Sequence, residues 1–165
     1  MLKEGERMMR RKDREVTEIQ ELLKIIDTCK VCRVVMQDKE GLYIVPLNYG
    51  YSFENEKLTL YFHSAKEGRK IDAMQENPNV CFEMDCEHQL VEGQIACAYG
   101  YSFKSVIGNG TVQFVTDMEE KKHALVLLMK HQTGKEFAFD EKMEDSVCVF
   151  RIDVSSMSGK NRPIA

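Results

Sequence analysis

The sequence predicts a mainly β domain, an antiparallel barrel with helices at its periphery. The chain has 165 residues, the size of one domain with a single core, and no Pro/Gly/Ser-rich linker divides it. Its hydrophobic patterns follow the order helix, strands, helix, strands, helix, strand, with about six or seven strand-like runs. Because so many strands exceed what one flat sheet carries comfortably, an antiparallel barrel is the natural closure.

The first helix follows a polar start. Thr17 is the expected N-cap, with Gln20 at the N3 position as in a capping box. A buried stripe at helical spacing consists of Ile19, Leu22, Leu23 and Ile26. A strand rich in β-branched residues then covers 31–36 and ends in a turn over 38–41.

Two further strands are expected over 42–51 and 57–63, joined by a turn at 54–56. In the second of them, apolar residues alternate with polar or aromatic ones. This period of two directs one set of side chains into the core, namely Leu58, Leu60 and Phe62.

The second half contains a strand over 79–85 that resumes near Gln94, and another over 102–115. A helix then opens with Asp117 and Glu120 as a capping box, buries Leu125, Leu128 and Met129 on one side, and ends at Gly134. The last strand is expected over 147–154. Loose tails are expected over 1–14 and 155–165.

Composition argues against several kinds of partner. The formal net charge of −4 offers no general attraction for nucleic acid, so any anion site must be local. The first fifteen residues are polar and mixed in charge, with no apolar stretch of a secretory signal, and no apolar run is long enough to span a membrane. We therefore expect a cytoplasmic protein that binds neither nucleic acid nor a membrane.

The cysteines predict structural thiols rather than a metal or redox site. Cys29 and Cys32 form one C-x-x-C motif, but a zinc site needs a second pair, and Cys81 and Cys86 have the wrong spacing. A redox motif would open a helix after a strand, whereas this pair follows a helix and opens a strand. Reduced cysteine in an apolar strand acts as a small hydrophobic residue.

The most informative segment is HSAKEGRKIDAM, residues 63–74. A strand ends at His63, and Ser64 with Glu67 forms the S-x-x-E pattern of a helix start. Pro78 ends the helix soon after its last apolar residue. A short helix is therefore expected directly behind a strand.

Three cations fall within the first two turns of that helix: Lys66, Arg69 and Lys70. The helix dipole disfavours cations at this end and favours anions. A phosphate dianion between the cations would relieve their repulsion and accept the free backbone N–H groups. The alternative is a solvated basic helix with Glu67 and Asp72 as partners, and these residues alone leave both interpretations open.

A second segment, 43–51, contains a proline inside a strand pattern. Pro46 removes a ladder donor, so it belongs on an edge or at a bulge. The free backbone groups of Val45, Leu47 and Asn48 are then available to a planar ligand such as an isoalloxazine. The alternative is an edge strand that Pro46 protects from aggregation.

In order, the motifs PLNYGY, LTLYFHSAKEGRKIDAMQENPNVCFEMD and YGYSFKSVIGNGTVQFV resemble the pyridoxamine phosphate oxidase-like FMN-binding split barrels, and most closely their nitroimidazole-resistance branch. The resemblance covers 29–154 and is most specific over 62–82. It implies a six-stranded antiparallel split barrel that forms a homodimer. It also implies FMN as the cofactor, bound in each of two clefts between the subunits.

The resemblance carries site roles to particular residues. The phosphate-binding pair matches Arg69 and Lys70, with Ser64 and Lys66 nearby. The strand along the flavin ring matches Val45, Pro46, Leu47 and Asn48, and the segment reaching the cofactor from the partner subunit matches Tyr101, Lys104 and Ser105. His63 matches a histidine beside the flavin with an active-site role, so it is the candidate catalytic residue. The alternative for His63 is a strand-end histidine satisfied by a backbone carbonyl.

The resemblance implies an FMN-dependent oxidoreductase that takes electrons from a reduced nicotinamide and reduces a nitroaromatic or another small electrophile. A non-catalytic flavin or haem carrier or sensor is the alternative. The true oxidases hold the vitamin phosphate with a late Arg-x-His element, where this chain reads Arg151-Ile152-Asp153, which argues against pyridoxamine phosphate oxidation. A single terminal phosphate site and the lack of a G-x-G-x-x-G motif favour FMN over FAD.

Overall fold

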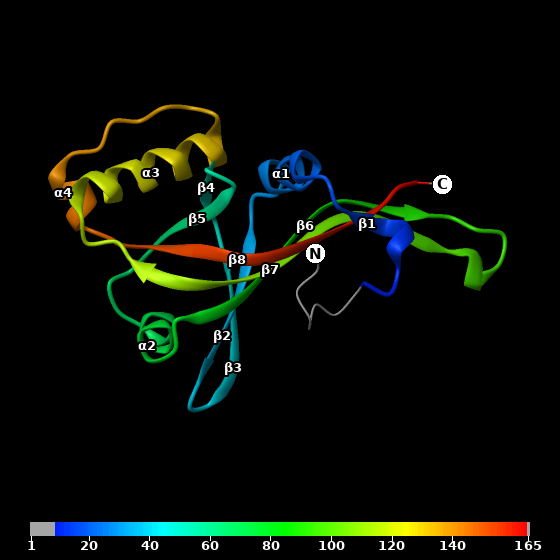
Figure 1. The fold of residues 1–165 in the computed structure, drawn as a ribbon, viewed down its shortest axis with the longest axis horizontal. Coiled ribbons are helices and arrows are strands. Elements are labelled where there is room, and N and C mark those ends of the chain that lie inside the picture. Colours follow the sequence, from blue (N-terminus) through cyan, green and yellow to red (C-terminus); the bar gives the residue numbers. More distant parts are fainter. Residues whose placement is uncertain (1–8, 165) are drawn as a thin grey trace.

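A computed structural model describes residues 9–164, in which one eight-stranded antiparallel sheet curls around the core (Figure 1). The strand order is β3-β2-β6-β7-β8-β5-β4, and β1 pairs with β8. The strands are β1 (Glu15–Val16), β2 (Cys32–Asp38), β3 (Gly41–Leu47), β4 (Gly50–Glu54), β5 (Lys57–Ser64), β6 (Asn79–Val91), β7 (Gly100–Phe114) and β8 (Cys148–Arg162). The predicted fold class is confirmed, with eight strands in place of six.

The barrel is open on one side. Strands β3 and β4 stand at the two ends of the strand order, and no ladder joins them in the described part of the chain. Only Asn48 and Tyr49 separate these two strands in the sequence. The outer edge of β3 therefore keeps backbone groups that no neighbouring strand uses.

The helices lie around the sheet as expected. They are η1 (Lys12–Arg14), α1 (Ile19–Thr28), α2 (Arg69–Glu76), η2 (Ala96–Ala98), α3 (Met118–Thr133) and α4 (Glu141–Asp145). Helix α3 covers β4 and β5 and forms a small second apolar cluster with Tyr61 and Val149. None of the described helices combines the length and the apolar content that a membrane crossing requires.

The barrel interior follows the predicted alternation. Leu58, Leu60 and Phe62 of β5 are all buried, and the rings of Phe62 and Phe150 stack with centroids 5.1 Å apart. Helix α1 buries Leu22, Ile25 and Ile26, while Ile19 and Leu23 of the predicted stripe are only partly buried. Hydrophobic burial of these side chains drives the curl of the sheet.

The start and end of α3 match the prediction. The Asp117 side chain accepts a hydrogen bond from the Glu120 amide at 2.9 Å, and Gly134 closes the helix in the left-handed conformation with φ 71°. Leu125 and Leu128 are buried, and Met129 is partly buried. For α1, in contrast, the expected cap is wrong: the helix follows Glu18 rather than Thr17 and has no side-chain cap.

The expected strand over 42–51 is two strands, β3 and β4. The strand is interrupted at Asn48 and Tyr49, and the ring of Tyr49 is fully buried. Its hydroxyl donates to the Ile26 carbonyl at 2.5 Å and lies 3.0 Å from the Cys29 carbonyl. Anchoring this side chain under α1 carries the backbone from pairing with β2 to pairing with β5.

The last strand is longer than predicted. Residues 155–162 continue β8, which pairs with β7 as far as Phe103 opposite Arg162. The loose tail expected from residue 155 is therefore wrong as far as residue 162. These residues are polar, but their backbone pairs with β7 and β1, so the side-chain pattern alone could not reveal the strand. At the other end, Lys12–Arg14 is a short 3₁₀ helix, and residues 1–8 of the expected tail lie outside the described residues.

Strand β6 also runs further than expected, to Val91, and nothing resumes as a strand near Gln94. The segment before β7 contains η2 instead. Strands β6 and β7 together form a long arm on the side of the molecule away from α2 (Figure 1).

Candidate functional site

The start of α2 is an uncapped helix N-terminus. The expected capping box is wrong, because Ser64 is the last residue of β5 and its hydroxyl donates to the Ala65 carbonyl at 2.8 Å. The N-cap is Gly68, with φ 128° and no side-chain cap, and a Cβ built there would meet nothing within 4 Å. The first intrahelical hydrogen bond runs from the Ile71 amide to the Gly68 carbonyl at 2.8 Å, so the amides of Arg69 and Lys70 precede it at the positive end of the helix dipole.

Arg69 and Lys70 are the first two residues of α2, whereas Lys66 precedes the helix, so the expectation that all three cations lie in its first two turns is right only for this pair. The Nε of Arg69 donates to Asp38 Oδ2 at 2.8 Å, and its Nη2 lies 3.3 Å from Asp38 Oδ1. The guanidinium also stands over the Tyr43 ring, 4.2 Å from the centroid. The partners of Arg69 are thus on the β2–β3 hairpin, and not Glu67 or Asp72 on its own segment.

Three ammonium groups share the neighbourhood of Cys148, which pairs with Ser64 across β5 and β8. They belong to Lys66, Lys70 and Lys121 and each lowers the pKa of the Cys148 thiol, although burial has the larger effect and raises it overall. Lys66 has a weak, exposed contact to Asp145 at 3.4 Å. The buried Lys121 comes from α3, and nothing near it in the sequence connects it to this segment.

His63 lies on β5, paired with Val149 of β8, and its side chain is exposed. Loss of part of its hydration, followed by the charge of Lys70, lowers the pKa of His63 below its usual value. The imidazole is therefore neutral at pH 7. Because a neutral imidazole can donate and accept, it suits a role beside a bound ligand.

Val45, Pro46 and Leu47 lie on β3, the free edge of the sheet, and Asn48 follows directly. This strand also carries Tyr43, which meets Arg69. The edge and the helix start therefore adjoin. The Asn48 side chain is occupied, because its Nδ2 donates to the Lys30 carbonyl at 2.9 Å, which leaves the backbone of this segment as the part available to a ligand.

Tyr101, Lys104 and Ser105 are on β7, far from α2. Along β8, Val149 pairs with His63 and Lys160 pairs with Ser105. These two positions of β8 are eleven residues apart, which at about 3.3 Å per residue is roughly 36 Å along the strand. A single chain therefore does not bring the β7 residues to the start of α2.

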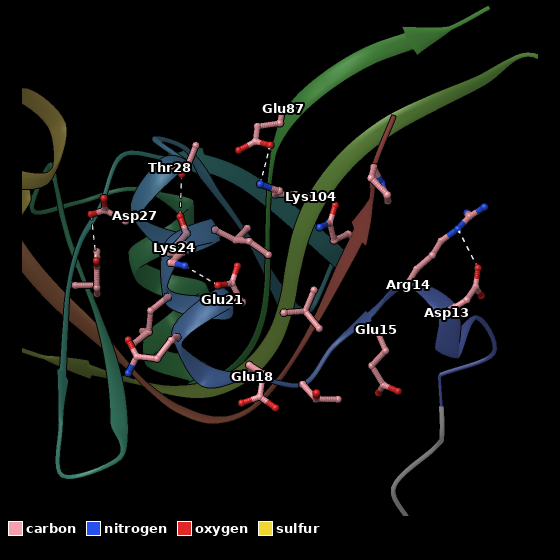
Figure 2. Close-up of a pocket in the computed structure, with 18 residues that line it drawn as sticks. Asp13, Arg14, Glu15, Glu18, Glu21, Lys24, Asp27, Thr28, Glu87 and Lys104 are labelled. Carbon is pink, nitrogen blue, oxygen red and sulfur yellow. Dashed lines mark hydrogen bonds and ion pairs between the residues drawn. The ribbon is translucent and has the colours of Figure 1, made fainter. Parts of the chain in front are cut away.

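A cavity of about 910 Å³ lies elsewhere, beside α1 (Figure 2). Six carboxylates and three cations line it, and of the predicted site residues it contains Lys104. Figure 2 shows Glu21 paired with Lys24 and Glu87 paired with Lys104, at 2.5 and 2.8 Å. This excess of negative charge disfavours a phosphate.

The cysteines and the late arginine are engaged in structure. Cys29 and Cys32 are buried free thiols, and burial raises the pKa of both. The Nε of Arg151 donates to Asp153 at 2.9 Å, and its guanidinium also pairs with Glu120. Within residues 9–164, no three His, Cys, Asp or Glu side chains gather as metal ligands.

An antiparallel barrel that is open beside a free edge is a split barrel, and the uncapped cationic start of α2 is its candidate site for an anion. The sequence model of pyridoxamine 5'-phosphate oxidase matches residues 18–161, and the chain belongs to that family. A search of curated proteins finds no match.

Solved structures agree. A candidate 5-nitroimidazole antibiotic resistance protein from Bacteroides thetaiotaomicron is 39% identical, with TM-score 0.77 over 88% of this chain and 85% of that one. An FAD-binding protein from Mesorhizobium loti is 28% identical, with TM-score 0.64 over 89% and 96%. The FAD and haem binding protein from Mycobacterium smegmatis shares the fold, at 15% identity and TM-score 0.77 over 90% and 73%.

Proposed function

We propose that this protein is a cytoplasmic, homodimeric FMN-dependent oxidoreductase that reduces nitroaromatic or other small electrophilic compounds. The observation that carries the proposal is the uncapped start of α2, where Arg69 contacts Asp38 and Tyr43 of the β2–β3 hairpin and Lys70 follows it in the helix. Family membership and the likeness to a nitroimidazole resistance protein support a flavin function.

The residues fit a flavin phosphate. The amides of Arg69 and Lys70 precede the first intrahelical hydrogen bond of α2, and the Asp38 carboxylate already occupies one edge of Arg69 as an anion would. Arg69 and Lys70 would hold the phosphate, with Ser64 and Lys66 beside them. Val45, Pro46, Leu47 and Asn48 would flank the ring, and His63 would stand near it, able to exchange a proton at an imidazole nitrogen.

A bound flavin supplies the transfer of hydride or electrons between a nicotinamide and the acceptor. The chain would fix the phosphate through Arg69 and Lys70, and residues 45–47 of β3 and the residue after them would cover one face of the ring. Arg151, held by Glu120 and Asp153, is not free to take a vitamin phosphate, so we do not assign pyridoxamine phosphate oxidation.

A dimer would complete the site. Tyr101, Lys104 and Ser105 lie too far from α2 to meet the same ligand within one chain, so a partner subunit would supply them. On the sheet face that carries Ser105, β3 exposes Leu42, Ile44 and Pro46, and β7 exposes Ile107. The ion-paired Arg33, Glu83 and Asp85 lie between them on β2 and β6. A twofold interface on this face would therefore bury both apolar and charged side chains.

The spectrum of the purified protein and its response to a reduced nicotinamide test the function. Bleaching of a flavin absorption, followed by reoxidation with a nitroaromatic acceptor, is the expected result. Chromatography of the heat-released cofactor should give FMN, and FAD would contradict that part of the proposal. A flavin that no nicotinamide reduces, or a haem Soret band, would favour the carrier or sensor function instead.

A further inference from the structure

We propose that Asp38 is a positioning residue that orients Arg69 toward the bound phosphate. The inference rests on the proposed function, since it takes Arg69 as a ligand of the flavin phosphate. Asp38 is the last residue of β2, far in sequence from the segment 63–74 that carries the cations.

Asp38 is held firmly. Its side chain is only 11% exposed, and Oδ1 accepts the Glu40 amide hydrogen bond at 2.8 Å across the β2–β3 turn. The hydrogen bond from Arg69 keeps the pKa of Asp38 below its usual value, so the group is charged at neutral pH. The carboxylate is therefore a fixed acceptor for the guanidinium.

Arg69 meets this acceptor with one edge. Nε and Nη2 face Asp38, and the Tyr43 ring supports the flat face of the guanidinium. No hydrogen-bond partner of Nη1 is found in the part of the chain that the structure describes. The arginine is thus ordered before any ligand arrives and keeps donors for it, while 42% of its side chain remains exposed.

Two effects oppose each other when Asp38 is removed. A free arginine must be ordered on binding, which lowers affinity. Removing the carboxylate also removes a negative charge near the phosphate, which raises affinity. Because solvent screens the longer-range repulsion more than it weakens the bidentate contact, we expect positioning to dominate.

The experiment measures dissociation constants of FMN and riboflavin by flavin fluorescence for the full-length, cofactor-free protein. We expect Asp38→Ala to weaken FMN binding by about three- to tenfold and to leave riboflavin unchanged. Asp38→Asn keeps an acceptor for the Glu40 amide and should show a smaller loss. The matched control is Glu40→Gln. Glu40 is a second carboxylate near Arg69, 3.5 Å from Nη2, but its side chain is exposed, so the substitution should change neither dissociation constant.

Tighter FMN binding by Asp38→Ala and Asp38→Asn would overturn the proposal, since Asp38 would then compete with the phosphate. Equal weakening of FMN and riboflavin would also overturn it and assign Asp38 to the fold. Where Asp38→Ala does not fold, Asp38→Asn decides. If Arg69→Ala itself shows no preference for FMN, the proposed function fails, whereas a selective Arg69→Ala with an inert Asp38→Ala refutes only the positioning role.

Discussion

The start of α2 and the cavity beside α1 differ in shape and in charge. Shape favours the α1 cavity as a binding site for a phosphate, whereas charge favours the start of α2. The α1 cavity measures about 910 Å³, but the carboxylates in its lining outnumber the cations by six to three, and two of the carboxylates are paired with lysines. The α2 start is open surface, yet it combines cations with unused backbone donors. A site shared by two subunits need not be a cavity in either one, so local charge and free backbone groups identify it better than volume does.

The largest expected effect comes from Arg69→Ala combined with Lys70→Ala. A charge-assisted hydrogen bond contributes roughly 1.5–3 kcal/mol. Losing two should therefore weaken FMN binding by about two to four decades, at roughly 1.4 kcal/mol per decade. Riboflavin affinity should barely change, because riboflavin lacks the phosphate.

The matched control for this double variant removes two cations from the other region, by Arg14→Ala with Lys24→Ala. It should leave FMN and riboflavin affinities as they are. A selective loss of FMN in the control, with none in the α2 variant, would move the phosphate site to the α1 cavity.

Mixing variants tests whether one site draws on both subunits. Neither Arg69→Ala/Lys70→Ala nor Ser105→Trp alone should bind FMN well. In a mixed dimer, one of the two sites combines the intact α2 of one chain with the intact Ser105 of the other. After unfolding and refolding the two together, about a quarter of all sites should recover, since half of random dimers are mixed. No recovery would mean that each chain builds its site alone.

The sequence predicted the helix that carries Arg69 and Lys70, and the edge position of Pro46, better than the path of the chain around them. A strand proline has a local signature, and so does the apolar spacing of α2, although the helix begins after Gly68 and not after Ser64. Asp38 and Lys121 could not be predicted, since each reaches the site through tertiary packing from another element. The interruption between β3 and β4 at Tyr49 and the length of β8 could not be predicted either, because both depend on backbone partners distant in the sequence.

Tyr49→Phe should affect stability and not the site. Its hydroxyl serves carbonyl groups of the α1 end, and removing it leaves them short of a donor. A loss of about 1–3 kcal/mol in the free energy of unfolding is expected by denaturant titration. The ratio of FMN to riboflavin affinity should remain that of the wild type. A changed ratio would show that the α1 end and the flavin site are coupled.

The smallest effect concerns His63. Its pKa is lowered in the folded protein, so the unfolded chain binds a proton more readily and stability falls as the pH drops through about 6.5. As the pH falls from about 7 to 5, we expect the free energy of unfolding of His63→Gln to rise relative to that of the wild type. The rise should stay below about 1 kcal/mol because the side chain is exposed. Saturating FMN should reduce this rise by neutralising Lys70. A difference in the free energy of unfolding that does not change with pH would contradict the lowered pKa of His63.

A crystal structure of the protein with FMN would show where the phosphate and the flavin ring bind. We expect phosphate oxygens within about 3 Å of the Arg69 guanidinium or of the first amides of α2. We also expect the flavin ring to lie along Val45 to Asn48, with Ser105 of a second chain facing it. A phosphate bound in the cavity beside α1, or a flavin held wholly within one chain, would contradict the proposed site.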